Sequence, residues 1–116
     1  MTYGMYVRKA REKRRQEDRS YSLRQVAMRI GIEPAYLSKI ERDQVAPPSE
    51  VTTRKLAAEL GEDTDILLAM SGKVSTDLRD IILKRPTLFG DLIRELKDMP
   101  DHAILRIARD VRDGDW

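Results

Sequence analysis

The sequence contains no cysteine, a single histidine (His102) and no long apolar run. Without cysteine there is neither a disulfide framework nor a thiolate site, and no spacing typical of metal ligands is present. A membrane-spanning helix needs about 20 apolar residues and a secretory signal an apolar core of about 7–15, and the chain has neither. A glycine-rich phosphate loop is also missing. We therefore expect a soluble, cytoplasmic protein without membrane association that is not an enzyme and holds no metal or cofactor.

Charge is abundant but unevenly distributed. Charged residues make up 36% of the chain, yet the net charge is only +2. Residues 1–60 hold 13 Lys and Arg against 8 Asp and Glu, a net charge of +5, whereas residues 61–116 hold 9 against 12, a net charge of −3. A basic front half and an acidic back half indicate that one end of the protein faces phosphate groups and the other does not.

The apolar residues recur with helical spacing, and no run alternates with period two for long enough to predict a strand. Proline, glycine and serine divide the chain into about eight predicted helices, near residues 4–18, 22–31, 34–42, 49–60, 64–70, 75–84, 86–98 and 100–114. We therefore expect an all-α fold. The length suits one domain, or one small domain with an appendage.

Two short amphipathic helices meet at Gly31. Ser22 is a good N-cap for the first of them, and Gly31 can adopt the left-handed conformation that ends it. Pro34 suits the first position of the second helix, where its missing N–H is not needed. Reading the major groove of DNA requires such a short helix, with small or polar outward side chains, held rigidly by a partner helix.

The outward side chains of helix 34–42 have the chemistry of base and phosphate contacts. Ala35 could touch a thymine methyl, Ser38 could bond either type of base, and Lys39 could reach guanine acceptors or a phosphate. Ser22 and Arg24 open the preceding helix, where free amides favour a backbone phosphate. The full set of predicted DNA-binding residues is Ser22, Arg24, Arg29, Pro34, Ala35, Tyr36, Ser38, Lys39, Arg42 and Gln44.

This run resembles the helix-turn-helix of the lambda-repressor-like, or XRE, family of transcriptional regulators. The family pattern reads roughly S-L-x-x-[LV]-A-x-x-x-G-[IV]-x-x-x-Y-L-S-x-[IL]-E-R-G, followed by P-P-S and L-A-x-x-L-G. The matching residues are Ser22, Leu23, Val26, Ala27, Gly31, Ile32, Tyr36, Leu37, Ser38, Ile40, Glu41, Arg42, Pro47, Pro48, Ser49, Leu56, Ala57, Leu60 and Gly61. The resemblance covers residues 4 to about 70.

The resemblance implies a five-helix, lambda-repressor-like DNA-binding domain over residues 1–72, followed by about three C-terminal helices over residues 73–116. It implies a sequence-specific regulator, in our interpretation a homodimeric repressor that reads a palindromic operator in the major groove of double-stranded DNA. It also implies an ion pair between Glu41 and an arginine of the first helix, and Arg11 stands at the matching position.

The chain departs from the family pattern in two places. Asp43 stands where the family usually has glycine, and Asp tolerates the left-handed conformation better than most residues. About four extra residues separate Arg11 from Ser22, roughly one helical turn. This insert either extends the first helix and contacts the DNA backbone or, as we favour, forms a solvated charged face. Its arginines are Arg14, Arg15 and Arg19.

The C-terminal region carries two apolar stripes. One consists of Leu88, Phe89, Leu92, Ile93 and Leu96, and the other of Ile104, Leu105, Ala108 and Val111. Because one recognition helix reads only a few base pairs, and dimers read half-sites about 34–36 Å apart, we expect these stripes to form a dimer contact. Alternatively, they pack on the front domain.

A different class of function would use the stripes to bind another protein. The chain would then be an antitoxin-type partner-binding protein that regulates its own gene through the helix-turn-helix, with a toxin or another protein antagonist as its partner. A third possibility is a protein adaptor that has lost DNA binding. The basic front half and the polar face of helix 34–42 argue against that possibility.

Overall fold

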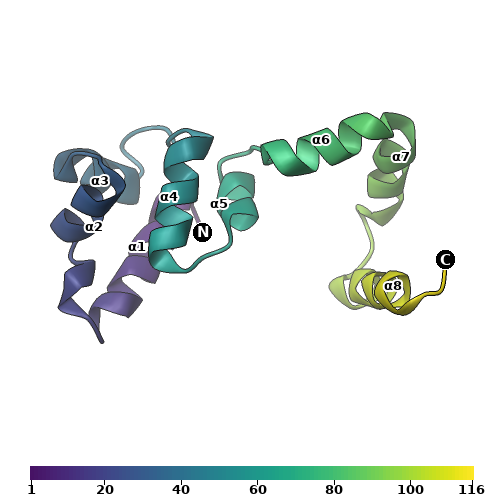
Figure 1. Ribbon diagram of the computed structural model, residues 1–116, viewed down its shortest axis with the longest axis horizontal. Coiled ribbons are helices and arrows are strands. Elements are labelled where there is room, and N and C mark those ends of the chain that lie inside the picture. Colours follow the sequence, from purple (N-terminus) through teal and green to yellow (C-terminus); the bar gives the residue numbers. More distant parts are fainter. The chain divides into compact units, whose positions relative to one another are not determined.

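The structure, a computed structural model, describes all 116 residues and is entirely helical (Figure 1). The predicted all-α fold is therefore confirmed. The helices are α1 (Tyr3–Arg15), α2 (Leu23–Ile30), α3 (Pro34–Glu41), α4 (Glu50–Leu60), α5 (Thr64–Met70), α6 (Thr76–Lys84), α7 (Pro86–Leu96) and α8 (Asp101–Asp113), with a short 3-10 helix, η1 (Arg19–Tyr21), between α1 and α2. The chain divides into two compact units, Met1–Ser75 and Thr76–Trp116.

Local capping signals set most helix boundaries of the first unit. Ser22 and Ser49 precede α2 and α4, and each hydroxyl accepts a hydrogen bond from a backbone N–H of the first turn. Gly31 and Gly61 follow the same two helices with φ of 77° and 68°, a conformation that glycine adopts without strain. These features are encoded within a few residues, so the predicted ends of these helices lie close to the observed ones.

The predicted end of the first helix is wrong by three residues. We expected the helix to continue to about Asp18, but α1 ends at Arg15. Asp18 instead caps η1, because its Oδ1 accepts a hydrogen bond from the Ser20 amide at 2.9 Å. Hydrogen bonding from Ser20 also holds the pKa of the Asp18 carboxyl below its ordinary value. The extra residues therefore form a separate turn instead of lengthening α1.

This insert is fastened to the rest of the first unit by arginines. Arg14 donates a hydrogen bond from Nε to the carbonyl oxygen of Leu60 at 2.7 Å, at the carboxyl end of α4. Its guanidinium carbon lies 5.5 Å from the centre of the Tyr21 ring, and that of Arg29 lies 5.1 Å from the same ring. These distances are those of cation–π contacts. Arg14 thus lies within α1 and bonds to the end of α4, and a contact of this residue with DNA stays a prediction.

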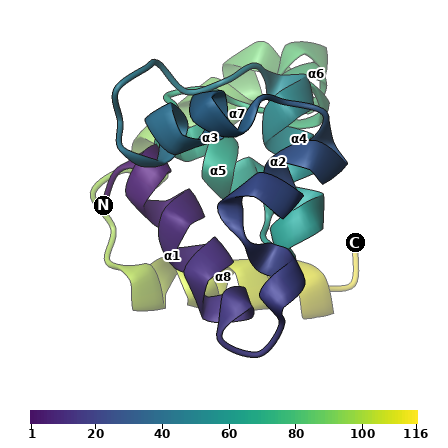
Figure 2. The ribbon, with the colours of Figure 1, turned by 90° about the vertical axis from the view of Figure 1, so that its left-hand side faces the viewer.

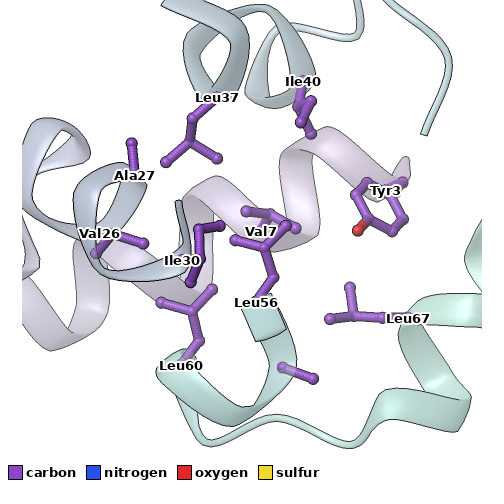
Figure 3. Close-up of a cluster of buried hydrophobic side chains, with 11 residues drawn as sticks. Tyr3, Val7, Val26, Ala27, Ile30, Leu37, Ile40, Leu56, Leu60 and Leu67 are labelled. Atoms are coloured by element: carbon purple, nitrogen blue, oxygen red, sulfur yellow. The ribbon is translucent and has the colours of Figure 1, made fainter. Parts of the chain in front are cut away.

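The core of the first unit lies where α1 to α5 meet (Figure 3). Tyr3 contributes a polar group to it: its hydroxyl lies 2.8 Å from Thr53 Oγ1, and burial raises its pKa. The apolar side chains of α3 point into this core, so the opposite face of α3 is left to solvent. The buried cluster consists of Tyr3, Val7, Val26, Ala27, Ile30, Leu37, Ile40, Leu56, Ala57, Leu60 and Leu67.

The second unit has no core of the same kind. None of the residues of α6, α7 or α8 is buried. From the predicted stripes, Leu88 is 69% exposed, Ile93 52% and Leu105 63%, which is unusual for large aliphatic side chains. Phe89, Leu96 and Ile104 are half-buried. No helix of the chain is long and apolar enough to cross a membrane.

Candidate nucleic-acid interface

A tight turn joins α2 to α3 and sets the direction of α3 (Figure 2). After Gly31, the amide of Ile32 donates a hydrogen bond to the carbonyl oxygen of Ala27 at 3.0 Å, closing the α2 end in the manner of a Schellman motif. Pro34 then occupies the first turn of α3. Because Leu37 and Ile40 are buried beneath it, α3 is held as a rigid helix on the surface of the unit.

The outward face of α3 is polar and accessible. Ala35, Tyr36, Lys39 and the following Arg42 are exposed, and Pro34 is half-buried. Lys39 forms no ion pair within the fold. Its charge is therefore available to a ligand, as base or phosphate contact requires.

Ser38 lies at the edge of this face. It is half-buried and borders a hollow where α1, α2 and α3 meet. Arg8 of α1 lines the same hollow and pairs with Glu12 at 3.1 Å. Arg8 is not among the predicted DNA-binding residues, because helical periodicity does not say which residues of α1 lie beside α3. The hollow is lined by Arg8, Arg11, Leu23, Ser38, Glu41 and Arg42.

The amino end of α2 presents groups that bind anions. Ser22 is the N-cap of α2: its hydroxyl accepts from the backbone N–H of Gln25 at 3.2 Å and donates to Gln25 Oε1 at 3.0 Å. The amides of Leu23 and Arg24 find no acceptor within the fold. Arg24 is exposed and has no ion-pair partner. The Ser22 hydroxyl is thus committed to the helix cap, whereas Arg24 and these amides remain free for a phosphate.

Arg29 differs from the other predicted DNA-binding residues because its side chain already bonds to other residues of the first unit. It forms an ion pair with Glu59 of α4 and donates a hydrogen bond from Nη1 to the Ser20 carbonyl at 2.7 Å. Its guanidinium also lies over the Tyr21 ring. Nε and Nη1 of Arg29 are therefore already bonded within the unit, and its contact with DNA stays a prediction.

Arg11 and Glu41 form the buried ion pair that the family resemblance implied. Arg11 Nε lies 2.7 Å from Glu41 Oε2 and Nη2 lies 2.8 Å from Oε1, a bidentate arrangement. Nη1 also donates to the Tyr21 carbonyl at 3.2 Å. The bonds to Glu41 raise the pKa of the Arg11 guanidinium further above its ordinary value. The pair connects α1 with the last residue of α3.

The residue after the α3 cap is also bound to α1. Asp43 has a φ of 56°, and its Oδ2 accepts a hydrogen bond from Thr2 Oγ1 at 2.5 Å while Oδ1 accepts from the Gly4 amide at 3.0 Å. Thr2 is itself the N-cap of α1, since its hydroxyl accepts from the Met5 amide at 3.1 Å. Gln44 follows Asp43 and is exposed.

The paired helices α2 and α3, with an exposed polar face on α3, define a helix-turn-helix protein. A family model described as a helix-turn-helix domain matches residues 6–73. The match covers more than half of the chain, so the protein belongs to this family, in agreement with its resemblance to the lambda-repressor-like regulators. Its helix-turn-helix unit is therefore a DNA-binding domain. No curated protein and no solved structure matches the chain.

Proposed function

We propose that the protein is a sequence-specific transcriptional regulator that acts in the cytoplasm as a homodimeric repressor and has no catalytic role. One observation carries this proposal: α3 presents an accessible polar face on a rigid helix pair, with the unpaired charge of Lys39 at its centre. That arrangement suits insertion of α3 into the major groove. Repression follows from occupancy alone when the operator overlaps a promoter.

The contacts divide into base reading and backbone attachment. Ala35, Ser38 and Lys39 stand on α3 and would set the preferred sequence. Arg24 at the amino end of α2 and Arg42 beyond α3 would bind phosphates on either side, which adds affinity without sequence information. The net charge of +5 over residues 1–60 supports this orientation toward DNA.

The second unit supplies the argument for a homodimer. Large apolar side chains along α7 and α8 are exposed, and exposed apolar surfaces of this kind are typical of interaction sites. Pairing of two chains through these helices would carry two copies of α3. The operator would then be a palindrome whose half-sites lie about 34–36 Å apart.

The test begins with selection of a preferred duplex from a randomised pool by the full-length protein. The selected duplex and a scrambled one are then titrated at low and at moderate salt. Lys39→Ala should weaken binding to the selected duplex by about tenfold and relax the preference at one base position, because a base contact is lost. Arg24→Ala should weaken both duplexes alike and reduce the salt slope by about one.

Lys13→Ala is the matched control for the loss of one positive charge. Lys13 is exposed on α1 and lines a hollow with Leu60, Gly61 and Glu62 that contains no residue of α2 or α3, so this variant should bind like the wild type. Wild-type binding by both Lys39→Ala and Arg24→Ala would show that α3 does not face DNA. Equal binding of the wild type to both duplexes at low salt, lost at moderate salt, would rule out sequence-specific reading.

An antitoxin-type function is the second candidate, and the same exposed helices favour it. The apolar faces of α7 and α8 would then cover a toxin or another protein antagonist, and DNA binding would serve only to regulate the protein's own gene. A full-length protein that is monomeric at micromolar concentration, with a small toxin-like reading frame beside its gene, would favour this function over the homodimeric repressor.

A further inference from the structure

Asp43 stands in a backbone conformation that does not favour it. It is the only non-glycine residue of the chain with a positive φ, 56°. Glycine adopts this conformation without strain, whereas a residue with a Cβ is strained there. Backbone preference alone therefore predicts that Asp43→Gly would make the folded protein more stable.

The Asp43 carboxylate binds the first turn of α1. One oxygen accepts from the Thr2 hydroxyl and the other from the Gly4 amide, at the end of the helix where the dipole favours negative charge. The helices approach closely here, because a Cβ at Gly4 would overlap the carbonyl oxygen of Ile40. The beginning of α1 thus rests directly on the end of α3.

A second bond joins the same two helices nearby. Glu41, two residues before Asp43, is held by Arg11 further along α1. Arg42 stands between the two bound carboxylates and Gln44 follows immediately after them. Both are exposed, and the Arg42 guanidinium bonds only to the Ser38 carbonyl of its own helix, at 3.3 Å. The direction in which Arg42 and Gln44 project is therefore set by two anchors on α1.

We propose that Asp43 is a positioning residue for DNA binding: by fastening the end of α3 to Thr2 and Gly4, it fixes where Arg42 and Gln44 meet the DNA. The proposal rests on the proposed function. Asp43 stands where the family usually has glycine. Glycine could not perform this role, because it has no carboxylate that could bind α1.

Three substitutions separate this role from backbone preference. Asp43→Gly relieves the strained conformation but removes the carboxylate. Asp43→Asn keeps the size and the tolerance for positive φ but removes the charge. Thr2→Val removes the hydroxyl that donates to Asp43 and also caps α1, and it leaves α3 untouched. Asp63→Asn is the matched control, since Asp63 caps α5 by accepting from the Asp65 amide at 2.8 Å, away from α3.

The measurements are the dissociation constants for the selected and scrambled duplexes at low and at moderate salt, at a temperature where circular dichroism shows every variant folded. The three variants should lose about tenfold in affinity for both duplexes and about one unit of salt slope, the effect of about one misplaced phosphate contact. The Asp63→Asn control should keep the wild-type affinities and salt slope. In a background that carries both Arg42→Ala and Gln44→Ala, Asp43→Gly should cause little further loss, because it acts through these two side chains.

Two outcomes would overturn the inference alone. The first is a wild type that prefers its selected duplex while Asp43→Gly and Asp43→Asn bind it equally well. The second is a set of variants that lose thermal stability but keep the wild-type salt slope, as the control does, which would reduce Asp43 to a structural role. A wild type that selects no duplex from the pool would instead refute the proposed function, and the positioning role with it.

Discussion

At the scale of single residues, Arg11 and Glu41 form a buried ion pair, in which each charge depends on the other for its stabilisation. Both side chains are almost fully buried, with relative exposures of 6% and 3%. Because removal of one partner leaves the other charge buried and unpaired, Glu41→Ala should lower the free energy of unfolding by about 3–5 kcal/mol. Urea unfolding followed by circular dichroism measures this loss.

A double substitution distinguishes a buried charge from lost packing. Arg11→Met combined with Glu41→Leu removes both charges and keeps apolar volume, so it should recover most of the stability that Glu41→Ala loses. If Glu41→Ala cost less than about 1 kcal/mol, the stranded Arg11 charge would have to be solvated, as exposed ion pairs are. The buried character of the pair would then be wrong.

The sequence predicts which side chains are exposed better than it predicts which residues they bond to. The outward positions of α3, such as Ala35 and Lys39, follow from helical periodicity, and the structure leaves both exposed. The partners of Arg29, however, are Glu59 of α4 and the Ser20 carbonyl of the insert. Periodicity describes only one helix at a time, so it could not reveal that this arginine is already engaged.

At the scale of elements, the extra residues between Arg11 and Ser22 are accommodated through contacts with the rest of the first unit. Arg14 caps the carboxyl end of α4 through the Leu60 carbonyl and lies over Tyr21. Arg14→Ala should lower the free energy of unfolding by about 1–2 kcal/mol, because a hydrogen bond to a charged group is lost at a helix end. Thermal or urea unfolding of the full-length protein measures the loss.

Arg15→Ala provides the control for this prediction, because Arg15 is exposed and forms no ion pair. It should leave stability within about 0.5 kcal/mol of the wild type, as exposed sites usually do. Neither variant should change DNA affinity by more than twofold if the insert serves only the fold. A clear loss of binding by Arg14→Ala, at full stability, would return the insert to the DNA interface.

Helix boundaries were predictable where their signals are local. Ser22, Gly31, Ser49 and Gly61 mark the ends of α2 and α4 in the sequence and in the structure. The end of α1 was not predictable in this way, since helical spacing continues past Arg15 although the helix does not. The contacts at this end, such as that of Arg14 with Leu60, join residues far apart in the chain.

At the scale of the whole molecule, the exposed stripes of α7 and α8 carry the proposed pairing of two chains. Leu92→Lys places a charge in the middle of the α7 stripe and should shift the full-length protein from dimer to monomer, since burying a lone charge in an apolar interface is unfavourable. Sedimentation velocity over a range of concentrations measures the shift. Affinity for a palindromic duplex should fall in parallel.

Thr87→Lys adds positive charge on the side of α7 opposite the stripe and should remain dimeric. If the wild type itself sediments as a monomer at all concentrations tested, the homodimer is wrong and a protein antagonist becomes the better partner for these helices. If Leu92→Lys and Thr87→Lys are equally dimeric, the α7 stripe is not part of the interface.

The whole-molecule organisation was predictable only for the DNA-binding half. The motif from Ser22 to Arg42 specifies how two helices pack, so the helix-turn-helix and its family followed from the sequence. The stripe from Leu88 to Leu96 specifies only that one face of α7 is apolar. An amphipathic pattern indicates that one face of the helix packs against another apolar surface, but it does not identify that surface.

The side chains that would form a core for α6 to α8 are the ones that these helices expose. In the proposed homodimer each chain completes the core of its partner. The free energy of folding of this unit therefore cannot be separated from the free energy of dimerisation. At low expression the amount of operator-competent protein then rises with the square of the amount of chain. A promoter under such control responds to a modest change in gene dosage more sharply than one governed by independent monomers.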